Sequence, residues 1–454
     1  MAVPIRRPDF CSMYPTLESF DRAMKQFAEV SHQADGIARV AALSTAAAPL
    51  AAAAAPSDVA AVAPAAAGGR IVPDHQGLIE MLLLTVPKFD DPASPGIAVD
   101  SRTARHIGSV LKGLGDTVEY LMVCAPNQEA ALRQLAHDMG ATKVRFIKSP
   151  HFSVSIWAQD AYVALCGAEG RVVLSEGVAM PRFEDMSVAD DIAAQVSQIT
   201  TFQSYLYFLG GNILGGSDVT LIGRDYVWRN AGRARLDDEQ AVERLYAQEL
   251  GTPVVTLGDK IDPRHKSLFD RGILTGHGLQ PIFHIDMYVT RTGEKTGEGK
   301  EIVFLGRPAP AKTIVGRYSD IPELDDPRFD AFFTDTRIQL VEAGFDVREL
   351  PIWMTFGNLR VPENVQKFYN LTWNNAIVQN GGPVKKVLLP NYTDEEDARI
   401  FGVDREVRCR LQRFVVEQWQ SLGFDVSLTN GIEDLAWGDG VVHCMTKVLK
   451  RTTP

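Results

Sequence analysis

Apolar residues recur along the chain in two different spacings. From about residue 71 onward, stretches with apolar residues three and four positions apart alternate with short runs rich in Val, Ile and Leu. The first spacing places apolar side chains on one face of a helix, and the second is typical of buried strands. This alternation predicts an α/β fold.

A helix–glycine–strand pattern repeats within this region. An apolar helical stretch ends near a glycine, which can adopt the left-handed conformation that ends a helix, and a valine-containing strand follows. The pattern occurs at 139–144, 250–254, 343–347 and 422–426. A less regular unit is predicted between Ala189 and Asp225, with a helix to about Thr200 and a strand over 203–208. Such self-similarity indicates repeated units around one axis, although the helix ends and turns of an ordinary α/β protein give the same signal.

The first 70 residues differ in composition from the rest. Residues 41–70 are rich in Ala and contain Pro49, Pro56, Pro64 and Asp58. Prolines and an acidic residue disfavour a membrane span, so this run is predicted to be a low-complexity linker. Before it, an N-terminal segment of residues 1–40 has the spacing of one amphipathic helix, which begins near Leu17.

Charge and cysteine content narrow the classes of function. The net charge of -11 disfavours sequence-independent binding to nucleic acid or to an anionic membrane, and it tolerates cationic substrates. Five cysteines are too few and too scattered for a disulfide scaffold, so reduced thiols are expected. The first 20 residues lack the layout of a secretory signal, and a cytoplasmic protein is expected.

Two polar motifs lie beside apolar strands in the first half of the chain. Asp160 ends the segment Trp157-Ala-Gln-Asp160 and precedes a strand; taken alone it would simply cap a turn. Gly211 and Asn212 follow a second apolar run. Glycine lets the backbone approach another group closely, and Asn offers a donor and an acceptor, although a plain β-bulge would explain both.

Two further motifs carry His and Cys. His284 and Asp286 are two positions apart in a predicted strand and would share one face. They could be metal ligands, but no third and fourth ligand follow at suitable spacing, so no metal is predicted. In the C-terminal strand, Cys444 follows His443. Adjacent strand positions face opposite sides, so His284 rather than His443 is expected to be the acid–base partner of Cys444.

Together these residue types suit chemistry on a guanidinium group. Two carboxylates such as Asp160 and Asp286 can hold the planar cation by its N–H groups. A thiolate of Cys444 can then attack the central carbon, while an imidazole protonates the departing amine and later activates water. The bound cation and a protonated His284 would both favour the thiolate.

The motifs resemble those of the guanidino-modifying, or pentein, superfamily, which has a five-bladed α/β propeller of ββαβ units. Their likeness is strongest to the compact bacterial protein-arginine deiminases. The resemblance implies a pentein catalytic domain over residues 71–454, preceded by the low-complexity segment. It assigns the nucleophile to Cys444, the catalytic histidine to His284, and the guanidinium-binding carboxylates to Asp160 and Asp286.

The resemblance also implies substrate-binding residues, namely Trp157, Arg182, Asn212 and Asn375, with Asn374 as the alternative to Asn375. The family's arginine, here Arg182, lies near the substrate backbone or carboxylate. Calcium-dependent animal members have acidic residues just after the Gln-Asp pair, where this chain has 161–163 Ala-Tyr-Val. No cofactor is therefore expected, and a calcium requirement is doubtful.

The predicted reaction is conversion of peptidyl arginine to citrulline and ammonia through a covalent intermediate on Cys444. Agmatine or free-arginine deimination and amidinotransfer are the alternatives, because the same four catalytic residues serve all of them. A non-catalytic propeller that only binds partners is the remaining alternative. Gln159 and Arg182 favour the peptidyl substrate, since agmatine deiminases usually have Arg in place of Gln159 and agmatine has no carboxylate. The expected partner is an arginine-containing protein, a peptide or a small guanidino compound; the oligomeric state is left open.

Overall fold

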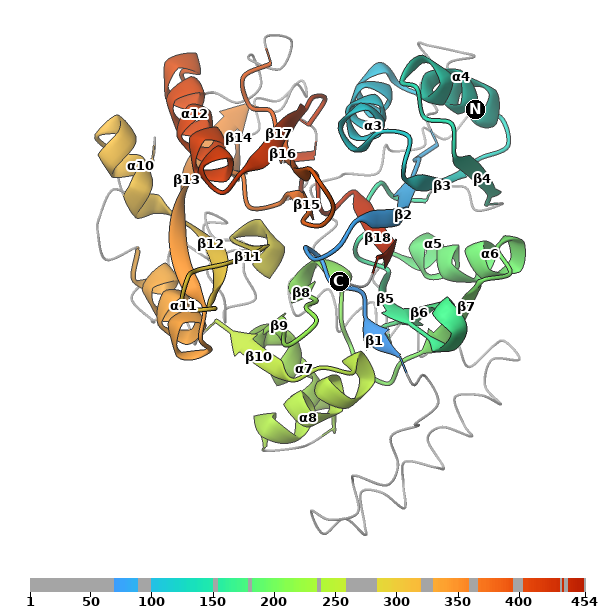
Figure 1. Cartoon of the computed structure of the whole chain (residues 1–454), viewed down its shortest axis with the longest axis horizontal. Helices are drawn as coiled ribbons and strands as arrows, with labels where there is room; N and C mark the ends of the chain where they lie inside the picture. The colour runs from blue at the N-terminus through green and yellow to red at the C-terminus, as the bar shows by residue number, and fades with distance from the viewer. Residues whose placement is uncertain are drawn as a thin grey trace, which may run out of the picture. The chain divides into compact units, whose positions relative to one another are not determined.

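The computed structural model describes most of the chain after residue 68 (Figure 1). The described residues are 69–88, 99–149, 154–178, 182–234, 238–258, 284–319, 330–358, 366–394, 403–432, 435–436 and 440–452. All of them belong to one of two compact units, which comprises Gly68–Val178 and Arg182–Pro454. The predicted N-terminal helix and nearly all of the predicted linker lie outside the described residues, but Arg70 already belongs to strand β1.

The described strands form five sheets of three or four strands each. In their order within each sheet, they are β1 (Arg70–Ile71), β5 (Tyr162–Cys166), β6 (Val172–Glu176) and β7 (Ile199–Gln203); β10 (Val254–Leu257), β9 (Thr220–Gly223) and β8 (Ile213–Leu214); β11 (Val289–Lys295), β12 (Glu301–Arg307), β13 (Asp346–Asn358) and β14 (Gln366–Thr372); β15 (Ile377–Gln379), β16 (Lys385–Pro390) and β17 (Phe424–Thr429); and β18 (Thr446–Arg451), β2 (Ile79–Thr85), β3 (Glu119–Cys124) and β4 (Val144–Lys148).

Helices connect the strands within these sheets. Five of them lead into β3, β7, β10, β13 and β17, which each pair in parallel with an earlier strand of the same sheet; these helices are α3 (Ser101–Leu114), α6 (Val188–Gln195), α8 (Glu239–Leu250), α11 (Ala331–Glu342) and α12 (Arg405–Ser421). The other α-helices in the described ranges are α4 (Glu129–Asp138), α5 (Phe183–Met186), α7 (Arg224–Ala234) and α10 (Pro308–Val315). No helix of this part of the chain combines the length and apolar character needed to cross a bilayer.

The same strand arrangement occurs in every sheet. Two antiparallel strands are followed by a helical crossover and a strand parallel to the second, as in β5, β6 and β7. The strands β8–β10, β11–β13 and β15–β17 repeat it. In the last unit the C-terminal β18 pairs antiparallel with β2, and β2 pairs parallel with β3, so strands from the beginning and the end of the described chain share one sheet (Figure 1). The predicted α/β class is confirmed, and the predicted repetition is confirmed for the strand pattern of the units.

The predicted helix-ending glycines have the required backbone conformation. Gly140, Gly251, Gly344 and Gly423 have φ values of 74°, 69°, 93° and 80°, and a strand follows each of them. Gly115 was not predicted as a helix end, but it has a φ of 85°, ends α3 and leads into β3. The step through α4 and Gly140 adds β4, a further strand in the same sheet.

The less regular unit differs from its predicted boundaries. Its strand β7 covers Ile199–Gln203 rather than 203–208. Helix α6 ends at Gln195, and Ile199 pairs with Val172, so the pairing with β6 begins sooner than the apolar pattern indicates. Tertiary pairing thus overrides the local signal at this strand.

Candidate active site

The predicted site residues other than Arg182, which lies between β6 and α5, lie in five turns that precede the first strand of each unit. Asp160 precedes β5, Asn212 precedes β8, His284 and Asp286 precede β11, Asn375 precedes β15, and Cys444 precedes β18. His284, Asp286 and Cys444 were expected within strands, and this expectation was wrong. Residues 285–287 form a 3₁₀ turn, and residues 442–445 form a turn before β18. Side-chain alternation along a strand therefore does not decide which of these groups meet.

Hydrogen bonds link these five turns one to the next. The bonds are Gly210 N–H to Asp160 O at 3.0 Å, Ile285 N–H to Asn212 Oδ1 at 3.0 Å, Thr372 Oγ1–H to Met287 O at 2.6 Å, His443 N–H to Asn375 O at 3.3 Å, and Gln159 N–H to Cys444 O at 3.1 Å. The last of them joins the turn of Cys444 to that of Asp160. Residues from distant parts of the sequence are thereby held together in one place.

Cys444 is buried, with 4% of its surface exposed. Its Sγ lies 3.0 Å from Asn375 Nδ2 and 3.3 Å from Asp286 Oδ2. Burial, together with the negative charges of Asp286 and Asp160, raises the pKa of this thiol well above its ordinary value. These effects favour the protonated thiol. A cation bound between the two carboxylates would offset their negative charge and so lower the pKa of the thiol.

The two neighbouring asparagines point to different groups. The Asn375 side-chain oxygen accepts hydrogen bonds from the backbone N–H groups of Val441, His443 and Cys444, at 3.1, 2.9 and 3.1 Å. The Asn374 amide instead donates to Thr290 Oγ1 at 3.2 Å and to Phe304 O at 3.0 Å, away from the cysteine. Of the two alternatives left by the sequence, Asn375 is the residue in contact with Cys444.

Gly211 lies beside three of the predicted catalytic residues, His284, Asp160 and Asp286. A Cβ atom at this position would come within 2.6 Å of His284 Nδ1 and within 3.2 Å of both Asp160 Oδ1 and Asp286 Oδ2. Any side chain here would fill the space between the imidazole and the two carboxylates. The close approach that a glycine permits is therefore used at the centre of the site.

Two carboxylate oxygens in this site have no hydrogen-bond donor among the described residues. They are Asp160 Oδ1 and Asp286 Oδ1, and both are buried. Burial raises the pKa of Asp160, although the neighbouring Arg182 acts in the opposite direction. An unsatisfied buried acceptor costs about 1–3 kcal/mol. A ligand with N–H groups would satisfy both oxygens.

His284 is fully buried beside these carboxylates. Its Nε2 forms a 2.9 Å hydrogen bond with the Tyr226 hydroxyl, and its Nδ1 lies 3.8 Å from Asp160 Oδ1. Burial lowers its pKa to about 3, so the ring is neutral near pH 7. Burial thus disfavours the protonated form of His284 that was expected to favour the thiolate. A neutral imidazole is instead suited to accept a proton.

His443 belongs to the site, contrary to the argument from strand alternation. Its Nδ1 lies 2.8 Å from Asp286 Oδ2, the same oxygen that Cys444 Sγ approaches. Its Nε2 lies 3.4 Å from Asp74 Oδ1. The turn at 442–445 brings both side chains to one side, which no periodicity in the sequence could indicate.

Three further predicted residues surround this cluster. Trp157 is 6% exposed and lies against the turn of Cys444, since a Cβ on Gly440 would be 2.5 Å from its ring and 3.1 Å from Cys444 Sγ. Asn212 is fully buried; its amide donates to Asp225 at 2.6 Å while its oxygen accepts from the backbone of Ile285. The contacts of Asn212 position the turn of Asp286.

Arg182, the third of them, contacts the carboxylates of the site. Its Nη2 lies 3.1 Å from Asp160 Oδ2, and its Nε lies 2.5 Å from Asp185 Oδ2. Asp185 is fixed in turn by the backbone N–H and hydroxyl of Ser155, at 2.8 and 2.6 Å. The structure thus places Arg182 on Asp160 itself.

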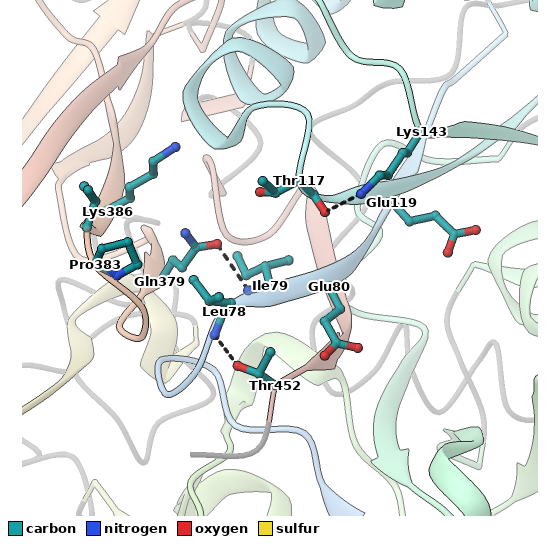
Figure 2. Close-up of a pocket in the computed structure, with 11 residues that line it drawn as sticks. Leu78, Ile79, Glu80, Thr117, Glu119, Lys143, Gln379, Pro383, Lys386 and Thr452 are labelled. Atoms are coloured by element: carbon teal, nitrogen blue, oxygen red, sulfur yellow. Dashed lines mark hydrogen bonds between the residues drawn. The ribbon is translucent and has the colours of Figure 1, made fainter.

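Other features of the described residues lie apart from this cluster. A pocket of ≈ 510 Å³ is lined by residues of β2, β3 and β16 and by Lys143, Gln379 and Thr452, and it contains none of the predicted site residues (Figure 2). In the described part of the chain, no group of three or more His, Cys, Asp and Glu side chains could hold a metal ion.

Comparisons with known proteins bear on the fold. No family model matches the sequence, and no curated protein matches it. The X-ray structure of a candidate agmatine deiminase superposes with a TM-score of 0.57 at 16% identity, covering 85% of this chain and 97% of that one. The chain has the fold of the agmatine deiminases. A cysteine-to-serine variant of the agmatine deiminase of C. jejuni with substrate bound gives a TM-score of 0.54 at 15% identity, with the same coverage.

The agmatine deiminase of Enterococcus faecalis gives a TM-score of 0.53 at 16% identity, again covering 85% of this chain and 97% of that one. These likenesses confirm the mixed α/β fold of pentein structures that the sequence motifs imply. At such low identity they concern the fold alone, and the chemistry must come from the site.

Proposed function

We propose that this chain hydrolyses a C–N bond of a small guanidino compound, with Cys444 as the nucleophile. This proposal is supported most directly by two buried carboxylate oxygens, Asp160 Oδ1 and Asp286 Oδ1, which have no hydrogen-bond donor among the described residues. A guanidinium carries N–H donors in a planar fork, and two carboxylates can bind it from its edges. Cys444 Sγ, 3.3 Å from Asp286 Oδ2, would then be next to the cation.

Substrate binding changes the charge around the thiol. Burial raises the pKa of Cys444, and the negative charges of Asp286 and Asp160 raise it further. A bound guanidinium neutralises part of that charge, so the thiolate becomes accessible when substrate is present. Charge complementarity also favours cations over neutral amides, because an uncharged ligand would leave both carboxylates buried without a counter-charge.

In the first half of the reaction, the sulfur of Cys444 forms a bond to the guanidinium carbon and gives a tetrahedral adduct. The thiol proton passes to neutral His284, which returns it to the departing nitrogen. The C–N bond breaks and ammonia leaves, which gives an S-alkylthiouronium. For His284 Nδ1 to accept a proton, Nε2 carries its own proton and donates it to the Tyr226 oxygen, 2.9 Å away.

In the second half, water attacks the same carbon and His284 takes its proton. The C–S bond then breaks as the hydroxyl of the adduct gives its proton to the sulfur, the ureido product leaves, and His284 releases its proton to the solvent. Each half of the reaction therefore uses one proton acceptor and no external oxidant or reductant. Asp160 and Asp286 hold the substrate in both halves, so their loss would affect binding as well as turnover.

A small substrate such as agmatine has better support than peptidyl arginine, which the sequence favoured. Three solved structures of similar fold, each with a TM-score above 0.5, bear the name agmatine deiminase. The contacts of Arg182, on which the preference for a carboxylate-bearing substrate partly rested, are with Asp160 and Asp185. Cys444, His284 and Asp286 are each at most 4% exposed, which suits a ligand that is enclosed on binding.

We also propose that the five ββαβ units are arranged as the predicted five-bladed propeller. The sheet pattern repeats five times, and the turns before the first strands are hydrogen-bonded in succession, from that of Asp160 round to that of Cys444 and back through Gln159. A site formed by all five turns is the expected result of such an arrangement.

Turnover measurements test the proposed function. Purified protein would be incubated separately with agmatine, free arginine and a capped arginyl peptide, and ammonia release would be followed. We expect turnover of a small guanidino compound, with agmatine above the peptide, and none in Cys444→Ala. Turnover of the peptide alone would overturn the choice of a small substrate. Absence of ammonia release from every guanidino compound would overturn the proposed hydrolase.

A further inference from the structure

His443 connects the site to a second carboxylate. The two nitrogens of its ring contact Asp286 Oδ2 at 2.8 Å and Asp74 Oδ1 at 3.4 Å. Asp286 comes from the turn before β11, whereas Asp74 lies between β1 and β2. One imidazole therefore bridges two acidic groups that come from connections far apart in the sequence.

The exposure of the three side chains increases along this bridge. Asp286 is 1% exposed, His443 9% and Asp74 17%. A small void of ≈ 10 Å³, roughly the volume needed for one water molecule, is bordered by all three residues. The bridge thus runs from the buried thiol toward the outside of the protein.

Charge distinguishes His443 from the other histidine of the site. Burial acts to lower the pKa of His443, as it does for His284, but hydrogen bonds to Asp286 and Asp74 raise it to about 9. The pKa of Asp74 is lowered, since the effect of burial is outweighed by His443, by nearby Lys447 and by the N–H of Gly215. A cationic ring between two anionic groups is the state that this geometry favours near pH 7.

Other charged and polar groups border the bridge. Lys447 lies on β18 and interacts with Asp74. The Arg451 guanidinium donates to the backbone oxygen of Asp74 at 2.6 Å, and Arg291 lines the small void. Arg451 thus contacts the main chain of Asp74, while the Asp74 carboxylate accepts from the Gly215 N–H through Oδ2 and faces His443 through Oδ1.

The two oxygens of Asp286 have different surroundings. Oδ2 contacts both His443 Nδ1 and Cys444 Sγ, whereas Oδ1 has no donor among the described residues. A carboxylate held by one oxygen in a charge-assisted bond cannot rotate without losing it. Its other oxygen then faces a ligand in a fixed direction.

We propose that Asp74 and His443 are positioning residues, which hold Asp286 through Oδ2 so that Oδ1 is presented to the substrate guanidinium. This inference rests on the proposed guanidino chemistry for its consequence, but the bridge itself can be tested without turnover. Asp74 was not among the residues that the sequence motifs indicated. Its role follows from contacts that form only in the folded chain.

Histidine NMR in the absence of substrate tests the bridge. The imidazole of His443, identified by its absence in His443→Gln, is expected to titrate near pH 9 in the full-length protein. In Asp74→Asn it should titrate at least about one pH unit lower, because a partner charge is lost. Asp218→Asn is the control, since Asp218 pairs with Arg291 at 3.0 Å, and it should leave the titration unchanged. An unchanged titration in Asp74→Asn would overturn the bridge.

Kinetics then test its consequence. In Asp74→Asn, His443 should lose its proton at a lower pH than in the unsubstituted protein. Above that pH, KM of the variant for the guanidino substrate should be about tenfold higher than KM of the unsubstituted protein. At lower pH the two KM values should become equal. A KM that stays equal at every pH would overturn the positioning role. If the unsubstituted protein turns over no guanidino compound, the proposed function fails, and the NMR titration still decides whether the bridge exists.

Discussion

The side-chain amide of Asn375 donates to Cys444 Sγ at 3.0 Å, and its oxygen accepts from the backbone N–H of the same cysteine at 3.1 Å. One side chain thus orients the sulfur and holds the turn that carries it. Asn375→Ala should lower kcat/KM about 10- to 100-fold and lower the free energy of unfolding by about 1–3 kcal/mol, because the backbone donors of that turn lose their acceptor.

Asn374→Ala is the matched control for this prediction, to be compared by steady-state kinetics and urea unfolding. Asn374 is adjacent and buried, but it bonds Thr290 and Phe304. Its replacement should reduce stability and leave the rate per folded molecule close to that of the unsubstituted protein. Equal rate losses in both variants would contradict a specific contact between Asn375 and the nucleophile.

Cys444 is predicted to be the one cysteine required for turnover. Cys444→Ala should abolish ammonia release, because the sulfur that forms the bond to the guanidinium carbon is lost. Cys166→Ala is the control: this thiol lies at the end of β5, partly exposed, and its pKa is raised chiefly by burial. The control should keep full activity; retained turnover in Cys444→Ala would exclude the mechanism.

Gly211→Ala should remove substrate binding. The added methyl would lie 2.6 Å from His284 Nδ1 and in the space between the two carboxylates, where the guanidinium is proposed to bind. Calorimetric titration with agmatine should show no binding. Gly232→Ala provides the comparison: Gly232 is in α7 with no atom within 4 Å of the new Cβ, so binding should persist and stability should rise by up to about 1 kcal/mol.

Asp225 should make stability depend on pH. Burial raises its pKa to about 7, from 3.8 in the unfolded chain, although Arg229 and the amide of Asn212 oppose this. Between these values the folded state keeps a proton that the unfolded state has lost. The stability that this group contributes is therefore complete below about pH 4 and falls, by at most about 1.4 kcal/mol per pH unit, as the pH rises to about 7.

Asp225→Asn removes this titration. Urea unfolding at pH 5 and at pH 8 should show that the stability of the variant, relative to the unsubstituted protein, is more favourable at pH 8. Asn can still accept the hydrogen bond from Asn212, which limits other losses. A stability difference that is equal at both pH values would show that Asp225 does not titrate in this range.

Local signals predicted much of the fold. Gly140, Gly251, Gly344 and Gly423 were predicted as helix ends because the left-handed conformation they adopt is a property of the residue itself. The boundaries of β7 were predicted less well, since they depend on its pairing with β6. Gly115 was not predicted as a helix end, although its local sequence carries the same signal, because the strand β3 that follows it was not predicted.

The sequence by itself determined which chemical groups this protein has at its candidate site, because Cys444, His284, Asp160 and Asp286 follow from residue identity and order. Tertiary structure alone decided how they meet. The contact of Asn375 rather than Asn374 with the thiol, the place of His443 beside Asp286, and the two carboxylate oxygens without donors among the described residues all depend on turns from five sheets. Spacing along a chain fixes directions only within one element, whereas distances between elements are set by packing.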